Sequence, residues 1–265
     1  MCAERPDLIS RISFPPPERV VKWGRLNRPG ESVFYGSAAP PGVFFELKAS
    51  AGSRIAFSQW EVMEPLWMHN LGYHADALAR LGAIPIDLRL ALTEPISNET
   101  RWNRRLRTQV ALAFTEDVPE GQEYRYQQSV AIKEFWCGHH DAFKIYPDGP
   151  QAPRVAGIVY PSLQMRGDAD NVAFWPEFVL SSLRLRQVQH VLVETADPKR
   201  LAFTFLTIAL SKGFAFGTTI LWRDELPPEA ERRCHIVLEG DTWVQRDGFG
   251  RVCRTHPEQR AGIVS

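Results

Sequence analysis

Short runs of β-branched, aromatic and aliphatic residues, bounded by glycine or proline, constrain the fold of this chain more than any other sequence feature. Such residues pack well on a half-buried pleated surface, so each run predicts a β-strand. A closing hairpin is expected over 234–255, with Asp247-Gly248 near its turn. The other expected strands cover 32–35, 55–63, 156–163, 171–175, 188–196 and 217–222.

Helical patterns fall between these runs. Cap-type residues open the segment 96–114, good helix formers fill 124–136, and the segment 199–213 ends at a glycine typical of helix stops. The run 43–47, VFFEL, is apolar around a single acid and is compatible with strand or helix. Because strands are not followed by helices in strict alternation, we expect an α+β fold in one domain, 1–265, with a mixed or antiparallel sheet core.

Composition narrows the class of protein. Hydrophobic residues make up 44 % of the chain, enough for a full core, and 31 basic residues balance 31 acidic ones. A balanced charge argues against direct nucleic-acid binding. No N-terminal run resembles a signal peptide, and no apolar stretch approaches the roughly 18 residues that span a bilayer. The spacing of the four cysteines fits neither a disulfide framework nor a metal site, so they are expected to be free thiols in a cytoplasmic protein. They are Cys2, Cys137, Cys234 and Cys253.

Familiar catalytic motifs are absent. The phosphate-binding patterns GxGxxG and GxxxxGK[ST] do not occur, and neither does the hydrolase elbow GxSxG. The stretch CGHHD carries four candidate metal ligands, and His69 and His74 add two more, but none has a zinc-type spacing. No metal is therefore expected, and metal-dependent hydrolysis is the weakest alternative. The four ligands of the stretch would be Cys137, His139, His140 and Asp141.

Four other residues carry suitable chemistry. Arg25 offers a planar fork for a phosphate, and Tyr35 offers a ring face and a hydroxyl. Glu46 is an acid in an apolar run, and Ser162 follows a proline that ends a strand. Each also has a structural interpretation: a surface arginine, a core tyrosine, an outward or ion-paired acid, and a turn serine. From these residues alone, the chain is an α+β domain with an unassigned site.

Two separated segments in the right order resemble the RES domain family, named after an Arg, a Glu and a Ser. GRLNRPGESVFYGS matches the family's first segment, and AGIVYPSLQMRGDADNVAFW matches its later one. The helix-type stretch YRYQQSVAIKEFW also resembles the one that precedes that later segment in the family. The matches cover about residues 20–47 and 124–175. The matching residues are Gly24, Arg25, Asn27, Pro29, Gly30, Tyr35, Glu46, Gly157, Ile158, Tyr160, Pro161, Ser162 and Asn171.

This resemblance implies an ADP-ribosyltransferase-like core and an enzyme that cleaves the nicotinamide–ribose bond of NAD, as a phosphorylase, a glycohydrolase or an ADP-ribosyltransferase. It implies that Arg25 holds the NAD phosphates, Tyr35 stacks on or orients the nicotinamide end, Glu46 lies at the reacting ribose and Ser162 lines the same pocket. Arg11 is a second arginine that could reach the phosphates. Many members are toxins of toxin–antitoxin pairs, so an antitoxin partner is expected; the oligomeric state stays open.

This chain departs from the family pattern in two places. The segment before Glu46 reads PPGVFFE rather than a run of small residues, so Glu61 and Glu64 are alternative acids. The interval between Glu46 and Ser162 is long, and 64–120 is interpreted as a helical insertion. A catalytically silent module that binds a nucleotide or a partner is therefore the second hypothesis.

Overall fold

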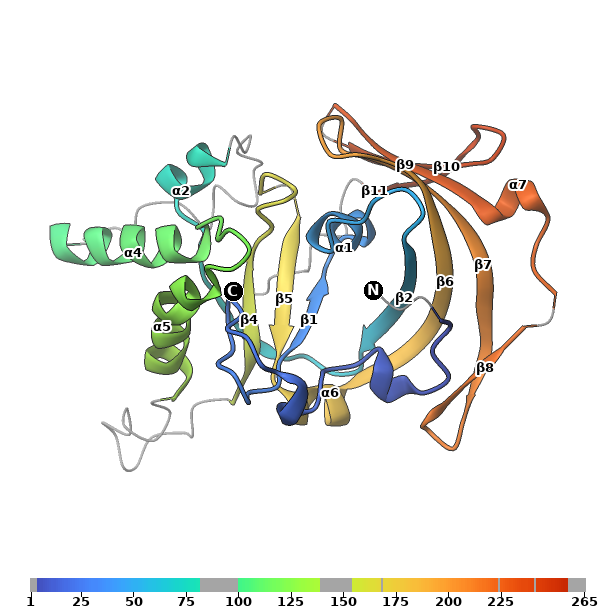
Figure 1. Ribbon diagram of the computed structural model, residues 1–265. Helices are drawn as coiled ribbons and strands as arrows, with labels where there is room; N and C mark the ends of the chain where they lie inside the picture. The colour runs from blue at the N-terminus through green and yellow to red at the C-terminus, as the bar shows by residue number, and fades with distance from the viewer. Residues whose placement is uncertain are drawn as a thin grey trace. The chain divides into compact units, whose positions relative to one another are not determined.

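The structure, a computed structural model, describes residues 4–81, 100–138, 154–167, 169–223, 225–240 and 242–256. It is a mixed α+β protein with two sheets (Figure 1). The chain divides into two compact units, one built from 1–14, 38–63 and 182–265 and the other from 15–37 and 64–181. We call them unit 1 and unit 2. A single domain over 1–265, with an insertion at 64–120, stays a prediction.

Unit 1 is built on a sheet in the order β11-β10-β9-β7-β6-β2, with β8 paired to β7. All its described pairings are antiparallel. Register shifts interrupt β2, β6, β7 and β10, and such bulges bend a strand and increase its twist; β6 and β7 are visibly curved in Figure 1. The elements are η1 (Ile9–Arg11), α1 (Pro40–Glu46), β2 (Arg54–Val62), β6 (Leu183–Asp197), β7 (Ala202–Ala215), β8 (Thr219–Trp222), α7 (Glu229–Arg232), β9 (Arg233–Glu239), β10 (Thr242–Asp247) and β11 (Val252–His256).

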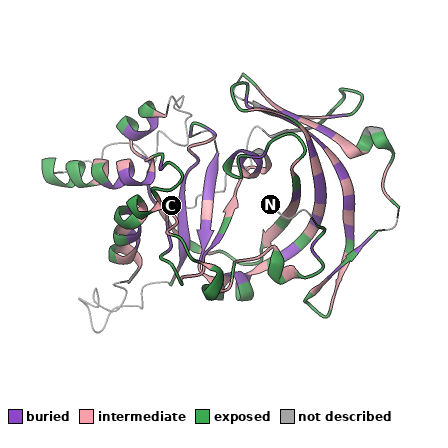
Figure 2. Ribbon diagram, viewed as in Figure 1, coloured by how far each residue is buried: buried purple, intermediate pink, exposed green. Residues whose placement is uncertain are grey.

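Unit 2 is built on a smaller sheet in the order β1-β5-β4-β3, antiparallel except for the parallel pair β3–β4. Strands β4 and β5 are buried along most of their length (Figure 2). The core includes Leu26, Phe114, Ile158 and Ala173, each fully buried. The elements are η2 (Pro17–Arg19), β1 (Phe34–Ser37), β3 (Trp67–Asn70), α2 (Ala75–Arg80), α4 (Arg101–Phe114), η3 (Glu123–Tyr126), α5 (Gln127–Gly138), β4 (Val155–Pro161), β5 (Asp170–Phe174) and α6 (Pro176–Ser182), whose last residue belongs to unit 1.

Most expected elements are confirmed. The runs at 55–63, 156–163, 171–175, 188–196 and 217–222 contain strands, and the run at 32–35 becomes β1 at a slightly later position. Helix α4 falls within the expected segment 96–114, of which residues 96–99 lie outside the described residues. Helix α5 overlaps the expected segment 124–136 but ends two residues later, at Gly138. The expected C-terminal hairpin is also present: Asp247 Oδ1 accepts hydrogen bonds from the amides of Phe249 and Arg251 in the β10–β11 turn.

The helix expected at 199–213 is wrong, because this segment is the strand β7. Burial alternates along it with a period of two: Phe203, Phe205, Thr207 and Ala209 are buried, and the residues between them are half-buried. Both faces are apolar, so the run resembles a buried helix segment. Gly213 does not end a helix; it lies at a register shift between β7 and β8.

His190, on β6, is expected to make the stability of unit 1 depend on pH. The residue is 4 % exposed, and its Nε2 has no hydrogen-bond partner among the described residues. Burial lowers the pKa of the imidazole below its usual value, and Arg54 and Arg5 lower it further. Below pH about 6.5 the unfolded chain therefore binds a proton that the folded chain resists.

We expect the free energy of unfolding to fall as the pH drops from 7.5 toward 5, and His190→Gln to reduce this dependence. Urea denaturation at several pH values measures it. The matched control is His235→Gln on β9, a half-buried histidine hydrogen-bonded to Thr204. An unchanged pH dependence in the His190 variant would contradict the assignment.

Candidate functional site

A tight turn presents Arg25. The amide of Gly24 donates to the carbonyl of Asn27 at 3.0 Å, and the amide of Asn27 donates back to Gly24 at 3.4 Å. Arg25 and Leu26 form the tip, and Leu26 is fully buried. A Cβ on residue 24 would lie 2.2 Å from Asn27 Oδ1, so the close approach requires glycine. The GRLN stretch is therefore a small rigid structure.

Asn27 and Tyr35 hold this turn from inside. Asn27 Nδ2 donates to the carbonyls of Lys22 and Arg28, both at 3.2 Å. The Tyr35 hydroxyl donates to Asn27 Oδ1 and accepts from the amide of Leu26, both at 2.9 Å. Burial of the hydroxyl raises the pKa of Tyr35 well above its usual value, so the phenol stays neutral. The residue as a whole is 41 % exposed.

The guanidinium of Arg25 lies at the end of α4. Nη1 donates to the carbonyl of Phe114 at 2.6 Å, and Nη2 donates to that of Glu116 at 3.0 Å. The guanidinium carbon is 5.1 Å from the ring centre of Tyr126 and 5.9 Å from that of Tyr160. A cation at a helix C-terminus satisfies unpaired carbonyls and complements the helix dipole. Arg25 thus links the turn, helix α4 and strand β4.

Arg28 and Glu31 attach the same turn region to α5. Arg28 forms an ion pair with Glu134, and Glu31 forms one with the buried Lys133. The Arg28 side chain is 54 % exposed, but its charge is paired. The two arginines of the segment have different partners.

Ser162 is completely buried at the end of β4. Its Oγ accepts a hydrogen bond from the amide of Met165 at 3.2 Å. Its own amide donates to the carbonyl of Ala169 at 2.8 Å, and the amide of Gly167 donates to its carbonyl at 2.7 Å. Within unit 2, Ser162 closes the loop between β4 and β5.

The remaining expected site residues belong to unit 1. Glu46 is the last residue of α1 and is exposed. Arg11 is the last residue of η1 and is also exposed. Of the alternative acids, Glu61 on β2 pairs with Arg186 on the neighbouring β6, and Glu64 is exposed in unit 2. The structure thus brings Arg25 and Tyr35 together and describes Glu46 and Arg11 in another unit.

Sequence reasoning missed two aromatic residues near Arg25. Tyr126 ends η3, and Tyr160 lies on β4 within the GIVYPS motif, yet neither received a role. Tyr160 also contributes to the raised pKa of Tyr35. The usable signal was the tyrosine of the motif itself, because an aromatic face within about 6 Å attracts a guanidinium.

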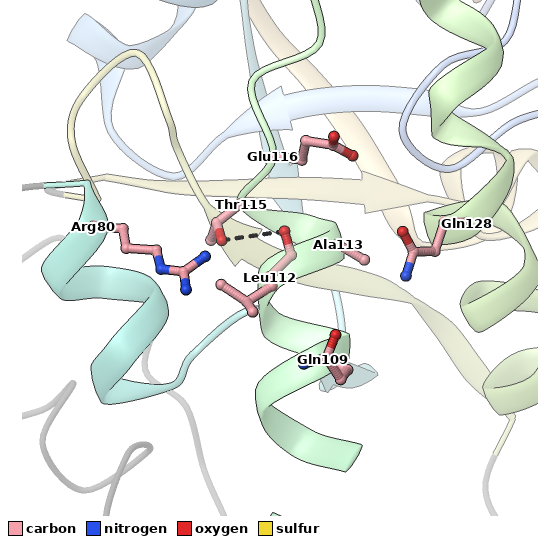
Figure 3. A pocket seen from close by; sticks show the side chains of 7 residues that line it. All are labelled: Arg80, Gln109, Leu112, Ala113, Thr115, Glu116 and Gln128. Atoms are coloured by element: carbon pink, nitrogen blue, oxygen red, sulfur yellow. Dashed lines mark hydrogen bonds between the residues drawn. The ribbon is translucent and has the colours of Figure 1, made fainter. Parts of the chain in front are cut away.

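A cavity of about 270 Å³ lies beside this region in unit 2 (Figure 3). None of the expected site residues lines it. Glu116 connects the cavity to the expected site residues, because its carbonyl accepts a hydrogen bond from Arg25. Its carboxylate forms an ion pair with Arg125. The lining residues are Arg80, Gln109, Leu112, Ala113, Thr115, Glu116 and Gln128.

The described residues contain no cluster of side chains suited to a metal ion. His139, His140 and Asp141 lie outside the described residues. Cys137 is described, and burial raises the pKa of its thiol to about 11. A protonated thiol is a poor metal ligand and a poor nucleophile. The free cysteines that the structure describes are Cys137, Cys234 and Cys253.

Comparison of the chain with protein-family models, with curated proteins and with solved structures finds no match. Across the described ranges, none of the helices has the length and apolar character needed to cross a membrane.

Proposed function

We propose that the protein consumes NAD by cleaving the bond between nicotinamide and ribose, with an ADP-ribosyltransferase-like core. The observation that carries the proposal is the convergence of its two motif segments. Arg25 from the first segment lies 5.9 Å from the ring of Tyr160 in the second, and strands β1 and β4 flank β5 in one sheet. Such convergence is what a shared site needs.

The residue chemistry supports this reaction. A guanidinium has five N–H groups, and Arg25 uses one from Nη1 and one from Nη2 on carbonyls, so it can hold further acceptors such as phosphate oxygens. Cleavage passes through an oxocarbenium-like state that a carboxylate stabilises. The proposal assigns that carboxylate to Glu46, with Glu61 and Glu64 as alternatives. Nicotinamide leaves from a cationic ring and needs no acid.

A specific observation favours the second hypothesis, a silent module that binds a nucleotide or a partner. Of the four expected catalytic residues, all except Glu46 have side chains whose hydrogen bonds stabilise unit 2. Arg25 bonds two carbonyls, the Tyr35 hydroxyl bonds the turn, and Ser162 closes a buried loop. Residues with these contacts would be needed for folding even without catalysis.

The test is nicotinamide release from NAD by the purified protein, with and without inorganic phosphate. We expect turnover, and we expect Glu46→Gln to reduce it by about 100-fold or more. Glu46 is exposed at a helix end, so the substitution should leave the fold intact. Glu61→Gln and Glu64→Gln distinguish the alternative acids, and the exposed Glu18→Gln is the control.

The outcomes separate the two hypotheses. If no nicotinamide is released with or without inorganic phosphate, the proposed enzymatic activity is contradicted. If calorimetry then shows that NAD binds without turnover, the silent module is supported. The toxin role and its antitoxin belong to the same proposal. Growth arrest on expression of the wild type, relieved by Glu46→Gln, is the result expected for a toxin.

A further inference from the structure

Helix α4 carries an unusual concentration of positive charge. Its sequence RWNRRLRTQVALAF has four arginines in seven residues and no acid. Thr100 already caps the helix, accepting a hydrogen bond from the amide of Asn103 at 3.2 Å. Cations near a helix N-terminus oppose the helix dipole, and Arg101 and Arg105 are like charges one turn apart. Arg101 and Arg105 therefore do not stabilise α4 through the helix dipole or through each other.

Exposed apolar side chains accompany the charge. Trp102 is 72 % exposed and Leu106 is 44 % exposed, and the first six residues of α4 are all exposed (Figure 2). Residues advance by about 100° around a helix. On that geometry Arg101, Trp102, Arg105 and Leu106 share one side, opposite the buried Phe114. The result is a cationic and apolar surface on one side of the helix.

The cavity of Figure 3 continues the same side toward the helix C-terminus. Gln109, Leu112 and Ala113 of α4 line it, and Arg80 of α2 and Gln128 of α5 enclose it from the flanks. Along this side, α4 therefore presents alternating cations and exposed apolar groups, followed by a hollow of about 270 Å³. We call the side formed by Arg101, Trp102, Arg105, Leu106, Gln109 and Leu112 the α4 face.

We propose that the α4 face binds an acidic segment of a partner protein, whose carboxylates meet Arg101 and Arg105 and one of whose side chains enters the cavity. Charge complementarity selects an acidic partner. Trp and Arg are the residue types that dominate protein–protein binding energy when they are clustered. Leu106 and Leu112 match apolar side chains of a peptide, which a phosphate backbone lacks.

The experiment uses the full chain and a fluorescein-labelled 14-residue helical peptide, with glutamates on one side and leucines on the other. Fluorescence anisotropy should show binding that weakens as salt increases. Arg101→Glu with Arg105→Glu should weaken it at least about tenfold, and Trp102→Ala should also weaken it. The control, Lys212→Glu with Arg223→Glu, makes the same charge change at exposed sites of unit 1 and should leave binding unchanged.

Circular dichroism checks that each variant folds. If the variant Arg101→Glu with Arg105→Glu does not fold, Arg101→Gln with Arg105→Gln is used in its place. Three results would overturn the proposal: no binding of the peptide, binding unaffected by the Arg101 and Arg105 substitutions, or tighter binding of a 14-nucleotide poly(U) RNA that depends on the same arginines. Nicotinamide release is measured separately on the same variants, so failure of this proposal and failure of the NAD proposal are distinguishable.

Discussion

Replacing Phe44 with alanine is expected to lower the free energy of unfolding by about 4 kcal/mol, because the truncation leaves a large cavity in the core of unit 1. Phe44 is 1 % exposed. Its ring centre lies 4.9 Å from that of Phe205, 5.2 Å from that of Phe203 and 5.8 Å from that of Phe57. These rings come from β2 and β7, so Phe44, together with its neighbour Phe45, packs α1 on its sheet.

Urea denaturation followed by circular dichroism measures the effect. Leu47→Ala is the matched control, because Leu47 directly follows the same helix and is 48 % exposed; its loss should change the free energy by less than about 0.5 kcal/mol. Equal effects of the two substitutions would contradict the packing of α1. The result also bears on function, since Glu46 is the last residue of this helix.

Replacing Arg25 with alanine is expected to lower the free energy of unfolding by about 3 kcal/mol, from two hydrogen bonds of a charged donor and the contact with a helix C-terminus. The carbonyls of Phe114 and Glu116 would lose their partner in a partly buried region. The cation–π contacts with Tyr126 and Tyr160 would also be lost. Thermal and urea denaturation measure the change.

Arg28→Ala is the control for Arg25, because it removes a nearby arginine whose ion pair with Glu134 is largely solvated. Its effect should stay below about 1 kcal/mol. Arg25→Lys keeps the charge and loses the planar fork, so an intermediate stability is expected. If Arg25→Ala were no more destabilising than Arg28→Ala, the stabilisation of the end of α4 by Arg25 would be disproved.

The Arg25→Ala variant is expected to lose both stability and activity. Loss of nicotinamide release in Arg25→Ala could follow from a weakened fold as well as from a lost phosphate contact. Glu46→Gln does not share this ambiguity, because Glu46 is exposed and ends a helix that Phe44 and Phe45 pack on its sheet. The assay on Glu46 therefore tests the chemistry, and the denaturation of Arg25 variants tests the architecture.

Local patterns were sufficient where one physical signal dominated. Strand β2 and the Asp247-Gly248 hairpin were predicted because their residue types and turn chemistry agree. Strand β7 was not, since apolar residues on both faces hide the period of two. Its strand state depends on pairing with β6 and β9, which are distant contacts that a local pattern does not contain.

The candidate site also has features that the sequence determined and features that only the tertiary structure decided. The sequence by itself determined that a glycine, an asparagine and a tyrosine lie close to Arg25 along the chain. That position 24 needs glycine is shown only by the structure, in which a Cβ there would lie 2.2 Å from Asn27 Oδ1. Only the tertiary structure decided what Arg25 contacts, because its carbonyl partners lie 89 and 91 residues further along the chain. A guanidinium binds any suitably placed oxygen, so its partner depends on which helix end the fold brings to it.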